Sequence, residues 1–251
     1  MNISRKYGRT YHYPFSPGTT SDDRINPTYW QYIQQIKTLI YTEKLDGENN
    51  CLSRYGVFAR SHATPTESAW SKQIRNHWQQ IKNDLGDLEI FGENLYAIHS
   101  IEYQNINSHF YIFGIRENNR WLSWEETKFY ARMLDFETVP ELKIIDFQTN
   151  AGSVQNAPYV EHIDEKSFQN DILELVKQPS TFGSMDIHTQ KPCTMEGIVS
   201  RNIEEYSVEN FSKNVFKYVR KGHVKTDEHW TRNWKRAKLN FEKGGDYVAT
   251  Y

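Results

Sequence analysis

A lysine followed two residues later by Asp-Gly is the stretch of this sequence with the clearest chemical potential. It reads Lys44-Leu45-Asp46-Gly47 and is preceded by Glu43. A lysine amine becomes a covalent nucleophile when burial or a nearby cation lowers its pKa from about 10.4. We expect Asp46 to orient this amine and Gly47 to permit a positive φ. The same letters also fit a surface turn, so this stretch alone leaves both interpretations open.

Two further charged residues lie in apolar stretches downstream. Lys217 lies in Val-Phe-Lys-Tyr-Val, where alternation places it on one face with Val219. A lysine that faces inward from such a strand needs an anion nearby. Its positive charge would also lower the pKa of Lys44. Glu196 precedes Gly-Ile-Val and offers the oxygen ligand that Mg²⁺ prefers. The alternative for Lys217 and Glu196 is an exposed strand position.

These stretches occur in a recognisable order with Phe-Gly-Glu-Asn around Glu93 and the apolar run 110–115. The series is similar to the motifs of the covalent nucleotidyltransferases, which include ATP-dependent polynucleotide ligases and capping guanylyltransferases. Within that superfamily, residues 7–224 most resemble the RNA ligase 2-like ATP-dependent RNA ligases. The resemblance implies a ligase adenylation (nucleotidyltransferase) domain over residues 1–224, followed by a short basic helical extension over 225–251.

The resemblance also implies a role for each matching residue. Lys44 forms a covalent lysine–AMP with ATP, Lys217 binds the α-phosphate, and Glu196 holds Mg²⁺ or Mn²⁺. The nucleotide and RNA contacts that it implies are Glu43 to the adenine amine, Glu93 to a ribose hydroxyl, Phe113 to the purine ring, Asn49 and Arg60 to the RNA ends, and Arg220 or Lys221 as a second cation. Two positions depart from the family: Val219 stands where many ligases have a basic residue, and Gly114 where they often have Asp.

The implied activity is the joining of 3′-hydroxyl and 5′-phosphate RNA ends through an adenylylated 5′ end, in RNA repair. A DNA ligase and a GTP-dependent capping enzyme are the alternatives within the same superfamily. Both generally append an OB domain, and the stretch after Lys221 is too short for one. A non-catalytic RNA-binding module is the alternative from another class, and it has no need of Lys44 together with Lys217, Glu93 and Glu196.

Composition fits one large domain with a small appendage. The chain has 251 residues and 29.8 kDa, and its 7 Trp, 16 Tyr and 13 Phe argue against disorder. No apolar run approaches the ~20 residues of a membrane span, so we expect no membrane partner. Cys51 and Cys193 are the only cysteines, which favours a reducing cytoplasm over a disulfide framework.

The charge is unevenly distributed along the chain. Residues 213–243 contain ten basic and three acidic residues, whereas the rest of the chain has 20 basic and 29 acidic ones. A basic end on an acidic body suits a local phosphate-binding surface, although a solvated basic helix fits as well. We expect this end, or a repair partner protein, to hold the RNA.

The pattern of apolar residues predicts an α+β fold with mainly antiparallel strands and outer helices. A strand over 36–42 leads into Lys44, with 52–58 as its hairpin partner. The other strands are expected at 88–95, 109–115, 143–147, 195–201 and 214–219. Helices are expected from 26, over 66–85, 123–133 and 164–177, and from 227; loops are expected at 16–23, 150–158 and 181–193.

Overall fold

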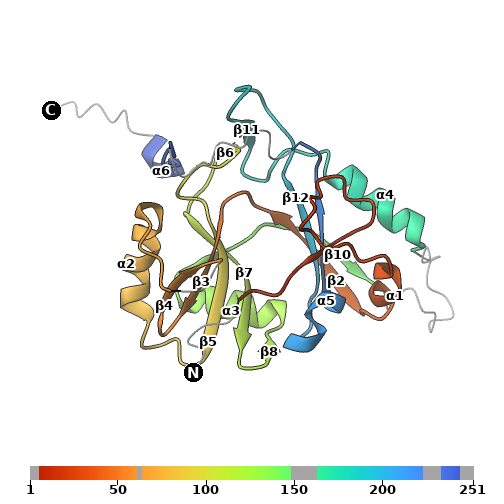
Figure 1. The fold of residues 1–251 in the computed structure, drawn as a ribbon, viewed down its shortest axis with the longest axis horizontal. Helices are drawn as coiled ribbons and strands as arrows, with labels where there is room; N and C mark the ends of the chain where they lie inside the picture. The colour runs from red at the N-terminus through yellow and green to blue at the C-terminus, as the bar shows by residue number, and fades with distance from the viewer. Residues whose placement is uncertain (1–5, 61–63, 148–162, 223–232, 244–251) are drawn as a thin grey trace, which may run out of the picture.

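Two β-sheets packed face to face form the centre of the protein, and helices cover their outer faces (Figure 1). The computed structural model describes residues 6–60, 64–147, 163–222 and 233–243. Nearly all strand pairs are antiparallel, which confirms the predicted α+β class. The expected loop at 150–158 and the expected helix start at 227 lie outside the described residues.

The first sheet has five strands, and the parallel pair β1–β14 is its exception. In spatial order they are β1 (Tyr11–His12), β14 (Val215–Val219), β12 (Gly197–Asn202), β2 (Thr38–Lys44) and β10 (Glu141–Asp146). The strands expected at 195–201, 214–219 and 143–147 are therefore confirmed within two residues. The first and the last of them, β12 and β10, flank the strand that ends at Lys44, and β14 lies beyond β12.

The second sheet contains the strands around Glu93 and Phe113. Its order is β13 (Tyr206–Ser207), β8 (Arg120–Trp121), β7 (Phe110–Glu117), β5 (Leu88–Asn94), β3 (Glu48–Ser53) and β4 (Gly56–Ala59), and β9 (Glu137–Thr138) pairs with β7. A separate two-stranded ribbon joins β6 (Ile101–Tyr103) to β11 (Ser184–Asp186). β11 lies in a stretch that the sequence predicted to be a loop, and β13 lies in one where no strand was expected.

The described helices are α1 (Tyr29–Ile33), η1 (Ala69–Ser71), α2 (Lys72–Ile81), α3 (Trp124–Met133), α4 (Glu165–Leu175), η2 (Val208–Asn210), α5 (Phe211–Asn214) and α6 (Asn240–Lys243). The longer helices lie on the two outer faces, α1 with α4 on one and α2 with α3 on the other. The helix expected over 123–133 is confirmed as α3, and Ser123 and Glu126 form a capping box at its start. The helix expected over 66–85 is shorter, because the amide of Thr66 bonds to the Val57 carbonyl and extends the sheet edge instead.

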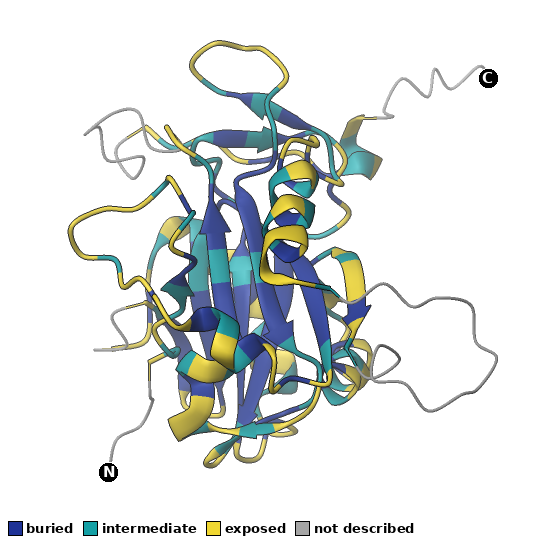
Figure 2. Cartoon of the chain, turned by 90° about the vertical axis from the view of Figure 1, so that its right-hand side faces the viewer, coloured by how far each residue is buried: buried dark blue, intermediate teal, exposed yellow. Residues whose placement is uncertain are grey.

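Three hydrophobic clusters hold these layers together. One lies between the sheets and includes Ile40, Phe91 and Trp121. A second packs α1 and α4 on the first sheet, and a third packs α2 and α3 on the second. Figure 2 shows the strands buried along most of their length, beneath helices that are exposed on one side. Among the described residues, no helix is long and apolar enough to cross a membrane.

The chain passes from one sheet to the other just after Lys44. β2 ends at Lys44 in the first sheet, and β3 begins at Glu48 in the second, so the predicted hairpin between 36–42 and 52–58 is wrong. β3 instead forms a hairpin with β4, and its turn contains Arg54 and Tyr55. Gly47 does not have the expected positive φ; a Cβ there would lie 2.5 Å from the Asn94 carbonyl oxygen. Glycine is required by this close approach between the sheets.

Candidate active site

Lys44 lies at the end of β2, directly beside Glu196. Gly197 pairs with Lys44 across the first sheet, so Glu196 reaches the lysine from the neighbouring strand. The Lys44 Nζ is 2.5 Å from the Glu196 Oε1, and their side chains are 26% and 4% exposed. A Cβ at Gly197 would overlap the Tyr218 carbonyl oxygen on β14. A glycine is therefore needed where β12 passes between the two lysine-bearing strands.

Carboxylates dominate the surroundings of Lys44. Burial lowers its pKa, but the charges of Glu196, Glu93 and Asp46 outweigh this effect, so the pKa is raised. The Asp46 carboxylate accepts from the amides of Ser100 and Ile101 at 2.8 and 2.9 Å, and so it fixes the following loop. The expected lowering of the Lys44 pKa is therefore wrong.

Lys217 is held by a carboxylate from the N-terminal segment. Its Nζ is 3.1 Å from the Asp23 Oδ1, which lies at the same distance from the Nε2 of His12. The backbone and hydroxyl of Thr20 donate to the other oxygen of Asp23, both at 3.0 Å. β1 brings His12 opposite Lys217 in the parallel pair with β14. Phe216 and Tyr218 point to the opposite, apolar face, as the alternation predicted.

Of the two lysines, Lys217 is the one whose pKa is lowered. Burial and the charge of Lys44 lower the pKa of Lys217, and Asp23 opposes this shift only in part. Burial, followed by the charge of Lys217, lowers the pKa of His12 to about 4, so this imidazole is neutral at pH 7. The site therefore contains two amines that disfavour each other's charge, which is an arrangement suited to a polyanionic ligand.

Glu93 approaches the turn after Lys44 from the second sheet. Its Oε1 accepts from the amide of Gly47 at 3.0 Å. Burial raises its pKa to about 8, and the charge of Lys44 opposes that shift, while Glu196 and Asp46 add to it. Three predicted site residues, Lys44, Glu196 and Glu93, thus come together where the two sheets meet.

Glu43 lies on the strand beside Lys44 and is almost fully buried, with 1% exposure. Its Oε2 accepts from the amide of Thr181 at 2.9 Å. Its Oε1 has no hydrogen-bond partner among the described residues. Burial raises the pKa of this carboxyl, with the hydrogen bonds from Ser180 and Thr181 acting against the shift. One buried oxygen is left to accept a hydrogen bond from a ligand.

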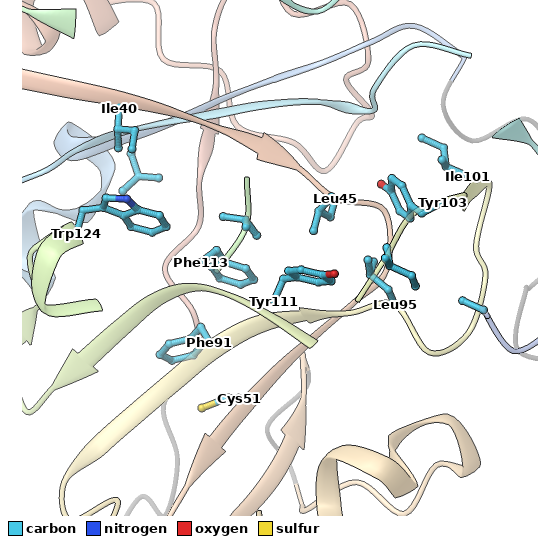
Figure 3. Packing of buried hydrophobic residues seen from close by; sticks show 14 of the residues in the cluster. Ile40, Leu45, Cys51, Phe91, Leu95, Ile101, Tyr103, Tyr111, Phe113 and Trp124 are labelled. Carbon is cyan, nitrogen blue, oxygen red and sulfur yellow. The ribbon is translucent and has the colours of Figure 1, made fainter. Parts of the chain in front are cut away.

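Phe113 lies between the two sheets, beside Tyr111 (Figure 3). It is only 9% exposed, and the ring of Tyr7 meets it edge-on at a centroid distance of 5.0 Å. The side chain of Arg201 donates to the Phe113 carbonyl and thereby links the two sheets. Stacking of Phe113 on a purine remains a prediction.

The residues predicted to bind RNA occupy two places. Asn49 on β3 pairs with Glu93, and the register of β4 places the exposed Arg60 opposite Asn49. Arg220 and Lys221 follow β14, where the Arg220 amide donates to the Glu196 carbonyl at 2.9 Å. Arg60 and Asn49 therefore lie at the same end of the second sheet as Glu93. Arg220 and Lys221 lie in the first sheet's part of the site, next to Glu196.

Comparison with known proteins assigns the chain to a family. The family model for RNA ligases matches residues 37–219, which contain Lys44, Glu93, Glu196 and Lys217. The chain belongs to the RNA ligase family. A comparison with curated proteins returned no match.

One solved RNA ligase structure shares the fold of this family member. A Naegleria gruberi RNA ligase mutant with ATP and Mn has 19% sequence identity and a TM-score of 0.50, over 92% of this chain and 63% of that one. An archaeal ATP-dependent RNA ligase has 14% identity and a TM-score of 0.48, over 86% of this chain and 48% of that one. The chain therefore spans less than two thirds of the length of either protein.

The sequence did not reveal the residues that surround Lys217. Asp23, His12 and Thr20 lie in a segment with Ser-Pro-Gly and Asp-Asp, which is typical of a surface loop. The only feature of this segment that could have indicated a role in the site was the pair of carboxylates at its end, Asp22 and Asp23. Tyr7 was also missed, although it contacts the rings of Phe91, Phe113, Trp121 and Phe211 at 5.0 to 5.2 Å.

Proposed function

We propose that this protein is an ATP-dependent RNA ligase that joins 3′-hydroxyl and 5′-phosphate ends in RNA repair. The observation that carries this proposal is the single cluster formed by Lys44, Glu196 and Glu93, with Lys217 on the next strand but one. A non-catalytic RNA-binding module gains nothing from a partly buried amine surrounded by three carboxylates, since such a cluster of charges is costly to desolvate without a function.

The chemistry proceeds in three displacements at phosphorus. The neutral amine of Lys44 attacks the α-phosphorus of ATP; the N–P bond forms, and the bond to pyrophosphate breaks. A 5′-phosphate oxygen of RNA then attacks that phosphorus, and the lysine leaves. The 3′-hydroxyl of the other end finally attacks the RNA phosphate and releases AMP. Lys217 stabilises the charge on the α-phosphate in the first step.

The environment of Glu43 favours ATP over GTP. Its buried Oε1 has no partner among the described residues and can accept a hydrogen bond. The exocyclic amine of adenine donates one, whereas guanine carries a carbonyl oxygen at that position. A buried acceptor left without a donor costs about 1–3 kcal/mol, so the base that supplies the donor is preferred. This acceptor on Glu43 is therefore the observation that supports adenine as the base.

A divalent cation fits the carboxylate side of the site. Among the described residues, no group of three metal-ligating side chains comes together. Glu196 would therefore hold Mg²⁺ or Mn²⁺ with phosphate oxygens and water as the other ligands, as is usual for Mg²⁺ at nucleotide sites. Such an ion would neutralise phosphate charge. By binding Glu196 it would also weaken the attraction between Glu196 and Lys44 that keeps the lysine protonated. Glu93 and Phe113 are assigned to the ribose and the purine.

Sealing of a nicked RNA duplex tests this function. With ATP and Mg²⁺ or Mn²⁺, we expect a joined RNA product, and an RNA with a 3′-deoxy end should accumulate the adenylylated 5′ strand. Sealing of nicked DNA without sealing of RNA would make the protein a DNA ligase, and labelling by GTP alone would make it a capping-type enzyme. Cytoplasmic location and a repair partner remain proposals that rest on the cysteine content and on the basic C-terminal end.

A further inference from the structure

The described C-terminal segment, residues 233–243, is bound along the edge of the adenylation domain. The Lys235 carbonyl accepts from the amide of Ile98, and the Ala237 amide donates to the Tyr96 carbonyl, both at 2.9 Å. Ala237 and Leu239 are buried in the cluster between the sheets. In Figure 1 this segment ends in α6, near β6. We call residues 233–243 the C-terminal arm.

The outward side of this arm is basic and aromatic. It contains four basic residues and one acidic residue, and Lys235 and Lys238 are exposed. Phe241 is 75% exposed, more than any other large hydrophobic side chain among the described residues. An exposed aromatic ring beside several cations is the combination that binds single-stranded nucleic acid, because bases stack on the ring while lysines neutralise phosphates.

The arm lies close to the end of the second sheet where Asn49 and Arg60 are predicted to contact RNA. The ring of Trp234 lies near Tyr96 and Trp70, with centroid distances of 5.9 and 6.1 Å. Asn94 joins this aromatic group to the sheet, since its side chain donates to Asn50 at 3.0 Å and to the Trp70 carbonyl at 3.4 Å. Asn50 follows Asn49, and Asn94 follows Glu93. The arm therefore lies at the same end of β3 and β5 as Asn49 and Glu93.

We propose that the C-terminal arm is an RNA-docking surface, on which an unpaired RNA strand stacks against Phe241 and places its phosphates at Lys235 and Lys238. This proposal rests on the proposed ligase function for the identity of the strand. Charge complementarity selects RNA over a protein partner, because the cations are concentrated on the arm while the remainder of the chain is acidic.

Binding of a fluorescent single-stranded RNA with a 5′-hydroxyl, in the absence of ATP, tests the arm separately from catalysis. We expect Phe241→Ala to weaken binding by about tenfold, a typical loss for one stacked base. The double variant Lys235→Ala/Lys238→Ala should weaken it by a similar factor. It should also reduce the slope of log affinity against log salt by about 0.7 for each lost phosphate contact.

Matched controls keep the test specific. Phe129→Ala removes another exposed ring, and Lys166→Ala/Lys191→Ala removes two exposed cations elsewhere. Equal affinity in the arm variants and the wild type, or an equal loss in the controls, would overturn the proposal and leave the arm to a protein partner. Labelling of the protein by ATP should be unchanged in every variant. If even the wild type failed to be labelled, the ligase function would fail while the RNA-binding result stood by itself.

Discussion

The Nζ of Lys217 and the Oδ1 of Asp23 lie 3.1 Å apart, although 193 residues separate them in the chain. The Asp23 carboxylate is therefore paired with Lys217, the lysine that we propose binds the α-phosphate of ATP. The hydrogen bonds from Thr20 and the contact with His12 fix that carboxylate in place. The protein thus pairs Lys217 with an acidic group of its own.

Replacing Asp23 by Asn should tighten the binding of ATP. The carboxylate and the nucleotide phosphates are like charges that share one amine, and the amide removes their repulsion. We expect the KM for ATP in the adenylylation reaction to fall about three- to tenfold. Asp22→Asn, at an exposed neighbouring position, is the control. A higher KM in Asp23→Asn than in the wild type would mean that Asp23 helps to hold the nucleotide.

Glu93 should make the protein less stable as the pH rises. The pKa of its carboxyl is about 8 in the folded protein and 4.5 as a reference value, so between these values the folded state holds a proton that the unfolded state has lost. Its contribution to stability is complete below about pH 4.5 and is lost as the pH rises through about 8.

The change to test is Glu93→Gln, which retains an oxygen to accept from Gly47. Urea unfolding at several pH values should show the wild type losing stability relative to this variant from about pH 5 to about pH 8. The comparison between the two proteins cancels other titrating groups such as His12, whose lowered pKa acts in the opposite direction. A difference that does not vary with pH would contradict the assignment.

Gly197 should be required for catalysis because of the space beside it. A Cβ would collide with the Tyr218 carbonyl, so Gly197→Ala must displace β12 from β14 and move Glu196 away from Lys44. We expect adenylylation to fall about 10²-fold, as small misplacements at reacting groups often do. Gly114→Ala is the matched control, since its nearest neighbour would be an ordinary 3.5 Å away. Equal activities in the two variants would refute this explanation.

Local patterns predicted the strands well and the contacts between distant segments poorly. The positions of β2, β12 and β14 were predicted from apolar runs, and motif order indicated that Lys44, Glu196 and Lys217 act together. Their adjacency in one sheet depends on pairing between distant segments, which periodicity does not encode. The crossing between sheets after Lys44 was misread as a hairpin because Asp-Gly is a typical hairpin turn.

The role of the N-terminal segment could not be read from its composition. Turn residues predict a loop wherever they occur. The parallel pairing of β1 with β14 brings His12 to Lys217, and the bridge between His12 and Ile25 then brings Asp23 there. The helix expected over 66–85 begins later for a similar reason, since the amide of Thr66 donates to the Val57 carbonyl on β4. In both places a tertiary contact decided the structure of a short polar stretch.

Covalent labelling with α-³²P-ATP is the most direct test that Lys44 is the nucleophile. After incubation with Mg²⁺ or Mn²⁺ and denaturation, we expect label on the wild type and on Lys37→Ala, which removes an exposed lysine before β2, and none on Lys44→Ala. Label retained on Lys44→Ala, or absent from the wild type, would contradict the account.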